Sequence, residues 1–493
     1  MSLQGFPARG LGLLGTALVA VGLALMSGCV VDQAKEVKIY RDVLDSKSKK
    51  PEPLKPGETL TLSRALELAN ADNEQLASQG ETYLQALIAK NRAFASFLPT
   101  LSFQPNFTAE DAPGGTEPAG SPGAPPVSEA SAAASSGGFQ QHGHVLTRLE
   151  APVVGTMNFS FRNVPLYRAA QIAVAQQRQL LLDAQATILL NVAQTYFQAV
   201  ISTKQVAVLE HSLNLQEARL KNLQGRFKVQ LSLALEVSQA EADLSAARVL
   251  LDRSVTDVRN GRRTLALLIG APVVDGPLVD DAVQPDPLPS MQSFVDTAMA
   301  HRQDLLAAQD AVKVAKKEVD AAIAEYYPSV SLNVAAYLYR EDYADSSKWN
   351  GVLSGNLPLF SGGAIRADVR TAWSRLRQAA LFESYLRREI DNGVKTAYDN
   401  VTTSAIVITE LANEVRASRD AYNQSVQMEK SGLALPLDVL TAQDQLLNSE
   451  LQYANESFTR TILYLDLVRA SGDLDPSTPE HLSWAPESAI VGR

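Results

Sequence analysis

Hydrophobic and polar residues alternate along four short segments of this chain, and this pattern predicts four β-strands. The segments are about 100–108, 153–162, 329–339 and 350–360, and in each nearly every second residue is apolar. A period of two places apolar side chains on one face of a strand and polar side chains on the other. Strands of about ten residues with one apolar face suit a transmembrane β-barrel. A soluble hairpin packed against helices is the alternative interpretation.

The stretches between the strand pairs are predicted to be long helices. Proline is absent from 166–271 and from 359–435, and apolar residues recur there every three or four positions. A helix over 166–224 would be about 90 Å long at 1.5 Å per residue. Two shorter helices are expected over 62–97 and 235–269. Their lengths suggest a wall in which one long helix lies beside two short helices placed end to end.

The chain also contains an internal repeat, which indicates a tandem duplication. The offset between matching segments is 229 before the strands and falls to 198 and then 202 after them. The difference between 229 and 198 places about 31 extra residues in the first copy, within 109–145, a stretch rich in Gly, Pro, Ala and Ser that predicts a flexible loop. The matching pairs are 66–71 with 295–300, Pro99 with Pro328, 158–168 with 356–366, 235–241 with 437–443, and Gly270 with Gly472.

The repeat predicts the organisation of the whole chain. We expect a signal peptide, a linker, a first repeat, a second linker, a second repeat and a tail. The corresponding ranges are 1–28, 29–59, 60–271, 272–289, 290–472 and 473–493.

Composition and charge exclude several classes of function. A net charge of −10 leaves no basic stripe for a nucleic-acid partner. The single cysteine, Cys29, excludes a disulfide or a cysteine zinc site within the chain. His142 and His144 are read as loop residues and not as metal ligands, because no further ligand stands near them. We expect no enzyme, no catalytic residue, no cofactor and no metal site, since no nucleotide-binding loop or convergent catalytic group is present.

The N-terminus predicts export. Arg9 precedes an apolar run over 11–25, which has the length of a signal-peptide core. The run ends in the residues 25–29, Leu-Met-Ser-Gly-Cys, which resemble a bacterial lipobox. This resemblance implies that Cys29 is lipidated and becomes the mature N-terminus. Val30 follows it in place of the Asp that would retain a lipoprotein in the inner membrane, so the outer membrane is expected.

Four strands per chain are too few to close a barrel, and open strand edges are not tolerated in lipid. The chain is therefore expected to form an oligomer. Three copies would supply twelve strands, an even number within the known range of barrels.

The mature chain resembles the TolC-type outer-membrane efflux proteins, and specifically their lipoprotein branch. The resemblance implies a mainly helical fold with membrane β-strands: a trimeric 12-stranded outer-membrane β-barrel continued by a long periplasmic helical barrel. It implies a passive exit duct for small molecules such as drugs, solvents or metal ions, working with a periplasmic adaptor, an inner-membrane pump and outer-membrane lipid. The residues that carry it are Leu60-Thr61-Leu62 with Ala65-Leu66, Pro99 and Pro328, Phe360 to Gly363, and Lys430 to Gly432 followed by 437–443.

The same resemblance implies an acidic gate at the periplasmic tip of the helices. Asp438 matches one acidic position of the family and Glu236 is its repeat mate, whereas a second family position is Thr441 here. A ring of carboxylates at a narrow mouth would attract cations. The alternative is that an acidic residue early in a helix only stabilises the helix N-terminus. Gly432 is expected to form the tip turn, and Gln230 stands where the first copy would need a glycine.

Two other functions stay open at this point. The same fold can serve as the exit duct of a type I protein-secretion system, which the sequence does not separate from small-molecule efflux. A structural coiled-coil lipoprotein without a pore is the second alternative. It predicts a single hairpin and no membrane strands, so the duplicated alternating segments count against it.

Overall fold

The computed structural model describes residues 31–44, 52–112, 144–279, 288–340 and 348–474. Within these residues the chain divides into two compact units, each of which takes segments from both predicted repeats. The helical unit comprises the described parts of 1–88, 172–312 and 377–493, and the sheet unit comprises those of 89–171 and 313–376.

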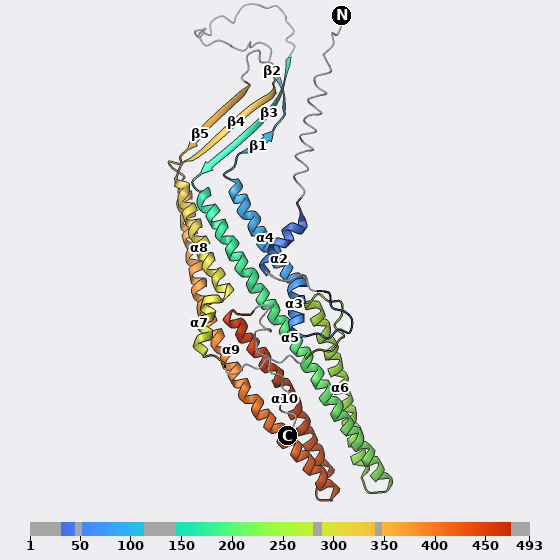
Figure 1. Cartoon of the computed structure of the whole chain (residues 1–493). Coiled ribbons are helices and arrows are strands. Elements are labelled where there is room, and N and C mark those ends of the chain that lie inside the picture. The colour runs from blue at the N-terminus through green and yellow to red at the C-terminus, as the bar shows by residue number, and fades with distance from the viewer. Residues whose placement is uncertain (1–30, 45–51, 113–143, 280–287, 341–347, 475–493) are drawn as a thin grey trace, which may run out of the picture. The chain divides into compact units, whose positions relative to one another are not determined.

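The described part of the sheet unit contains an antiparallel sheet of five strands in four rows (Figure 1). Strand β3 lies between β4 and a first row in which β1 is followed by β2, while β5 pairs with the other side of β4. Four rows agree with the four strands that the alternating pattern predicts. The bounds are β1 Thr100–Phe103, β2 Asn106–Ala112, β3 His144–Ser160, β4 Ser329–Arg340 and β5 Trp349–Asn356.

The first row is interrupted at Gln104 and Pro105, which the sequence prediction did not anticipate. Pro105 has no N–H group to donate to the neighbouring strand. The Gln104 N–H still donates to the Pro152 carbonyl at 3.0 Å. The register between β3 and β4 shifts between Ala151 and Pro152. Proline therefore disturbs two neighbouring strands at the same level of the sheet.

Several strand bounds differ from the prediction. Strand β2 continues to Ala112 and β3 begins at His144, so both extend into the predicted loop 109–145. These ends pair with each other, Ala112 opposite His144, because backbone hydrogen bonding continues where the side-chain alternation fades. Strand β5 stops at Asn356, before 360, because Pro358 cannot donate to the ladder.

The register of the sheet separates an apolar face from a polar face. Opposite residues of an antiparallel pair lie on the same face. On one face, Phe159 lies opposite Val330 and Met157 opposite Leu332. The positions between them carry polar pairs such as Asn158 with Ser331. The apolar side chains are exposed, and every residue of β5 is exposed as well.

Two helical hairpins dominate the helical unit. Helices α5 and α9 contain 66 and 67 residues, about 100 Å each, and their partners α6 and α10 contain 35 and 36. None of the described helices contains an apolar stretch long enough to cross a membrane. The bounds are α2 Gln33–Leu44, α3 Leu62–Asp72, α4 Glu74–Ala95, α5 Asn163–Lys228, α6 Ala234–Leu268, α7 Met291–His301, α8 Gln303–Ile323, the 3-10 turn η1 Ala324–Tyr326, α9 Ala364–Lys430 and α10 Pro436–Ser471.

An ion pair at the same place in each hairpin joins its two helices. Arg248 on α6 lies 3.0 Å from Glu217 on α5, and Arg419 on α9 lies 2.8 Å from Glu450 on α10. The positions match at the predicted offset of 202, but the charges are exchanged between the two helices. The duplicated hairpins therefore share a geometry while differing in charge.

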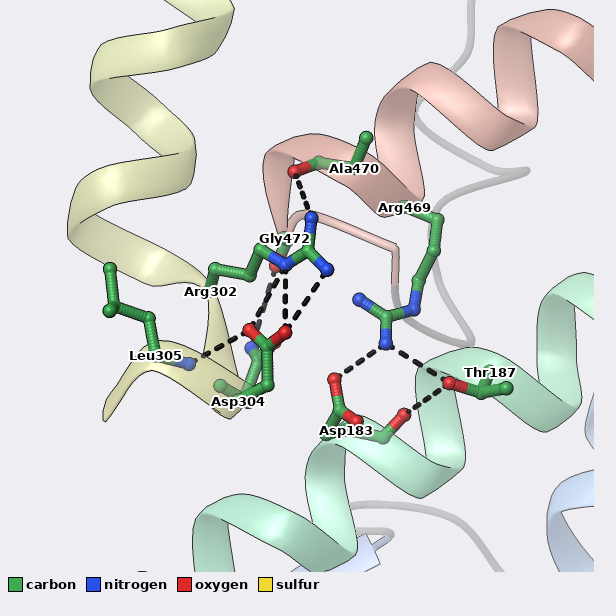
Figure 2. A network of polar contacts seen from close by, with 9 residues as sticks. Asp183, Thr187, Arg302, Asp304, Leu305, Arg469, Ala470 and Gly472 are labelled. Carbon is green, nitrogen blue, oxygen red and sulfur yellow. Dashed lines mark hydrogen bonds and ion pairs between the residues drawn. The ribbon is translucent and has the colours of Figure 1, made fainter. Parts of the chain in front are cut away.

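The single helix predicted over 62–97 is wrong, because the structure divides it at Asn73 into α3 and α4. The second repeat has the same division at Arg302, between α7 and α8. The side chain at each division donates to a carbonyl near the end of a hairpin helix. Asn73 Nδ2 lies 2.9 Å from the Leu268 carbonyl of α6, and Arg302 Nη1 lies 3.4 Å from the Ala470 carbonyl of α10 (Figure 2).

Glycine permits this close approach. Gly270 after α6 and Gly472 after α10 have φ angles of 70° and 84°, the left-handed conformation that often ends a helix. A Cβ atom on Gly472 would lie 2.9 Å from the Cα of Arg302, and one on Gly270 would lie 2.9 Å from the Cβ of Asp72. The divided helix thus satisfies carbonyls that a helix end leaves without partners.

A second arginine ties the two repeats together. Arg469 on α10 donates to the carboxylate of Asp183 and, at 3.0 Å, to the hydroxyl of Thr187, both on α5 (Figure 2). The Arg469 side chain is 13% exposed. Little water therefore competes with this pair, which fixes the end of α10 against α5.

The largest core cluster packs around Tyr196 and Phe197 of α5, both 0% exposed. The Tyr196 hydroxyl donates to the carbonyls of Leu60, at 2.9 Å, and Val279, at 2.7 Å. Leu60 also forms a bridge with Leu278. The segment after the first repeat is thereby held against the beginning of that repeat.

A helix occupies part of the predicted linker 29–59. Helix α2 packs into the largest core, with Tyr40 lying against Gly80 of α4 so closely that a Cβ there would reach 2.3 Å from the ring. Arg41 donates to the carbonyls of Asn70 and Ala71. These partners lie far along the chain, which is why the short helix was not recognised from its own sequence.

Gly276 provides a test of the contact between the two segments that flank the first repeat. A Cβ at this position would lie 1.9 Å from the Glu58 carbonyl oxygen. We expect Gly276→Ala to lower the free energy of unfolding by about 1–3 kcal/mol, because backbone atoms must move apart. Denaturant unfolding of the purified protein, followed by circular dichroism, measures this change.

Gly393→Ala is the matched control. Gly393 lies within α9 and a Cβ there would meet nothing within 4 Å. Alanine should stabilise the helix by up to about 1 kcal/mol, since it restricts the unfolded chain. Equal effects of the two substitutions would show that the close contact at Gly276 is unimportant.

Candidate functional site

The tip turns of the two hairpins have the same backbone. Helix α5 ends in a turn in which Gln230 has a φ of 65°, and α9 ends in one in which Gly432 has a φ of 73°. The Leu231 N–H donates to the Arg226 carbonyl at 2.8 Å, and the Leu433 N–H donates to the Met428 carbonyl at the same distance. This pattern is a Schellman motif, whose left-handed position favours glycine. The first turn has the same conformation without a glycine, so Gln230 does not change its shape.

Glu236 and Asp438 occupy the third position of α6 and α10, and each accepts a hydrogen bond from the backbone just before its helix. The Leu233 N–H donates to Glu236 Oε2 at 3.1 Å, and the Leu435 N–H donates to Asp438 Oδ2 at 2.8 Å. Both carboxylates therefore act as N-terminal caps. The geometry of both repeats therefore includes the helix-stabilising role that the sequence left open as an alternative to the gate.

The two carboxylates differ in their surroundings. The Ser232 hydroxyl also donates to Glu236. This bond lowers the pKa of the Glu236 carboxyl, and the Leu233 N–H and the charges of Arg226 and Arg219 lower it further against the effect of partial burial. Glu236 is thus held in its charged form.

Asp438 is exposed and lies in a shallow groove between α9 and α10. Ala417, Ser418 and Ala421 contribute small side chains to this groove from α9. The Thr441 hydroxyl donates to the Leu437 carbonyl of its own helix at 3.0 Å. The second family acidic position therefore supplies no charge here, and Asp438 is the carboxylate of this groove.

Each tip turn exposes three leucines, which the sequence prediction did not single out. Their exposures lie between 61% and 75%. Clusters of exposed apolar side chains commonly mark contact surfaces. The sequence does contain a signal for these residues, because leucine occupies every second position in both turns and the two sets match at the offset of 202. The six residues are Leu231, Leu233, Leu235, Leu433, Leu435 and Leu437.

An ion pair between the two hairpins lies next to the tips and was also missed. Arg226 Nη1 near the end of α5 lies 3.0 Å from Glu429 Oε1 near the end of α9. Arg226 and Glu429 are not repeat mates, so no sequence pattern connected them.

Farther from the turns, burial raises the pKa of the Asp444 carboxyl, and the nearby charge of Asp243 raises it further.

Some predicted positions lie outside the described residues. They include Cys29, the signal peptide and His142. His144 is the first residue of β3. The described ranges contain no group of three or more His, Cys, Asp or Glu side chains suited to a metal ion.

The reciprocal substitutions Gln230→Gly and Gly432→Gln test the tip conformation. A left-handed non-glycine residue costs about 1–2 kcal/mol. We expect Gln230→Gly to slow amide hydrogen exchange across the first turn and Gly432→Gln to accelerate it across the second. Hydrogen-exchange mass spectrometry of peptides covering 226–236 and 428–438 measures both effects. A change of the same sign in the two turns would contradict the shared geometry.

Known proteins are similar to this chain in sequence and in fold. A family model described as outer membrane efflux protein matches residues 294–473, within the second half of the chain. Outer membrane efflux protein BepC of Brucella suis is 23% identical over 309 residues, which are 62% of this chain and 67% of BepC. Probable outer membrane lipoprotein SilC of Salmonella typhimurium is 20% identical over 299 residues, 57% of this chain and 62% of SilC.

The fold similarity extends further along the chain. The crystal structure of the CmeC outer membrane channel from Campylobacter jejuni matches with a TM-score of 0.72 at 15% identity, covering 89% of this chain and 92% of CmeC. The sequence matches to BepC and SilC span about two thirds of those proteins or slightly less. The resemblance that the repeated motifs predicted is confirmed by the family model and the relatives. The chain is thus similar to the outer membrane efflux proteins, and the family model covers residues 294–473 of it.

Proposed function

We propose that this protein is the outer-membrane exit duct of a tripartite efflux system, through which small molecules leave the cell passively. The observation that carries this proposal is the sheet, which has one exposed apolar face and, among the residues that the structure describes, two unpaired edges. Lipid would cover such a face, but it cannot satisfy the N–H and C=O groups of an open edge.

Closure by further copies of the chain resolves this conflict. The edge rows are β1 with β2 on one side and β5 on the other. Joining the edge of one copy to the opposite edge of the next makes a ring, and three copies give twelve strands. A homotrimer therefore gives both edge rows a neighbouring strand, as the sequence predicts.

The hairpins supply the periplasmic part of the duct. Helices of about 100 Å are much longer than a globular core requires. The exposed leucines of the tip turns offer apolar surface to a periplasmic adaptor, and the adaptor connects to an inner-membrane pump that provides the energy. BepC is named an outer membrane efflux protein and SilC a probable outer membrane lipoprotein. Both names support an outer-membrane location, and the name of SilC supports lipidation at Cys29.

The gate is proposed at Asp438, with Glu236 as its counterpart in the first repeat. Threefold symmetry would turn each carboxylate into a ring of three charges. The capping bonds hold both side chains at fixed positions beside the tip turns, where Gly432 and Gln230 reverse the chain. A fixed ring of carboxylates favours cations and repels anions at a narrow opening.

Planar-bilayer recording of the purified protein, with native mass determination of the same sample, tests the duct and the gate together. We expect a trimeric mass and ion conductance. Asp438→Asn should lower the cation-to-anion permeability ratio by about twofold or more at low salt, because it removes the charge of the ring. The asparagine oxygen can still accept the Leu435 N–H, so the helix cap is kept.

Asp438→Ala separates the two roles of this residue. It removes both the charge and the cap, so it should lower selectivity equally and also reduce stability by about 1 kcal/mol. A monomer without conductance would refute the duct. A conducting trimer whose selectivity is unchanged in Asp438→Asn would refute only the gate.

The ion pair between Arg226 and Glu429 is proposed to hold the tips together at rest. Both side chains are partly exposed, at 41% and 22%, so each pair contributes at most about 1 kcal/mol. We expect Arg226→Ala to raise the resting conductance by up to about fivefold, the factor that 1 kcal/mol represents. Single-channel recordings measure this change.

Two further variants sharpen this experiment. The double substitution Arg226→Glu with Glu429→Arg restores an ion pair and should restore the resting conductance. Arg248→Ala breaks an ion pair of the same 3.0 Å length within one hairpin and should leave conductance unaltered. An equal increase in Arg248→Ala would mean that any lost surface charge loosens the tips.

A further inference from the structure

A pocket of about 500 Å³ lies in the sheet unit at two connections between strand and helix. One connection leads from β3 into α5, and the other leads from α8 through η1 into β4. The strands concerned, β3 and β4, are the two inner rows of the sheet. The pocket is lined from the side of the first connection by Phe161, Val164 and Arg168, among others. From the side of the second connection its lining includes Lys317, Asp320 and Tyr327.

The pocket continues the apolar face of the sheet. The Phe161 ring packs against Phe159 with a centroid distance of 5.4 Å and against Tyr327 at 5.9 Å. Phe159 lies opposite Val330 on the apolar face. A hydrocarbon chain lying on that face would therefore reach Phe161 and Tyr327 without crossing a polar surface.

The charges around the pocket leave one positive charge in excess. Lys317 Nζ lies 2.8 Å from Asp320, and Arg162 lies 3.2 Å from Glu325. Arg168 is exposed and makes no ion pair or hydrogen bond with the residues that the structure describes. A single guanidinium beside an apolar wall is complementary to a ligand with one negative charge and a long apolar part.

We propose that this pocket binds one glycerophospholipid of the periplasmic leaflet, with its phosphate at Arg168 and an acyl chain along Phe161 and Tyr327. This inference rests on the proposed function, because the proposed duct has its strands in the membrane and its helices outside the membrane. The connections from strand to helix then lie at the level of lipid headgroups, where aromatic and basic side chains are favoured.

The site occurs once in the described part of each chain, at the two connections to the inner rows. It lies between the inner rows of the sheet, so a neighbouring copy that pairs at β5 or at the first row does not need to cover it. The repeat mate of Lys317 is Ile88, and the mate of Arg168 is Arg366. The matching positions at the two outer connections, α4 to β1 and β5 to α9, therefore have one cation where this pocket has two, and Arg366 provides a matched control.

Native mass spectrometry of the full-length trimer in detergent, titrated with dioleoylphosphatidylglycerol, tests the proposal. We expect the unsubstituted protein to retain one phosphatidylglycerol per chain. Arg168→Ala should weaken this binding by about tenfold or more, because a charge-assisted contact to phosphate is lost. Arg366→Ala removes another exposed arginine, near the start of α9, and should leave binding unchanged.

Two additional measurements identify the ligand. Val164→Phe keeps every charge but fills the pocket, and it should also prevent lipid retention. Glycerol phosphate, which has no acyl chain, should fail to displace the bound phosphatidylglycerol. Its displacement of the lipid would indicate a simple phosphate site and overturn the proposal.

Two results of the lipid titration would overturn the proposed site. Equal binding by Arg168→Ala and the unsubstituted protein, or equal losses in Arg168→Ala and Arg366→Ala, would overturn the site. The trimeric mass and the bilayer conductance of each sample are recorded at the same time. A sample without either refutes the proposed duct, whereas a conducting trimer with unaltered lipid binding in Arg168→Ala refutes the lipid site alone.

Discussion

The need of every backbone N–H and C=O for a partner is the constraint on which this structure depends. At the helix divisions, Asn73 and Arg302 donate to carbonyls near the ends of the hairpin helices. At the tips, Glu236 and Asp438 accept the N–H groups before the returning helices. Each junction of the helical unit is thus a place where a helix end finds a partner, and the duplication preserves both kinds of junction.

The same constraint explains why one chain is incomplete in a membrane. The inner rows β3 and β4 have partners on both sides, while the edge rows have one. Water satisfies an open edge, whereas lipid does not. In a membrane, an exposed apolar face beside open edges requires pairing between copies, and this physical conflict is the basis of the proposed trimeric duct.

The two repeats share a backbone but differ in charge, and two of the differences are located where function is proposed. The hairpin ion pairs exchange their acidic and basic residues between helices. The tip ion pair joins Arg226 to Glu429, which are not repeat mates. The proposed lipid site has Lys317 where the other copy has Ile88. Duplication therefore produced the geometry of the wall, and later divergence produced its distinct surfaces.

The sequence by itself determined the strands, the hairpins and the tip turns, because each depends on periodicity or on residues close together in the chain. The alternating segments predicted the four rows, and the offset of 202 paired Glu236 with Asp438 and Gln230 with Gly432. Only the tertiary structure decided the division at Asn73, the helix α2 and the ion pair of Arg226. Their partners lie far away in the sequence, and no local pattern specifies which distant carbonyl or carboxylate will be within reach.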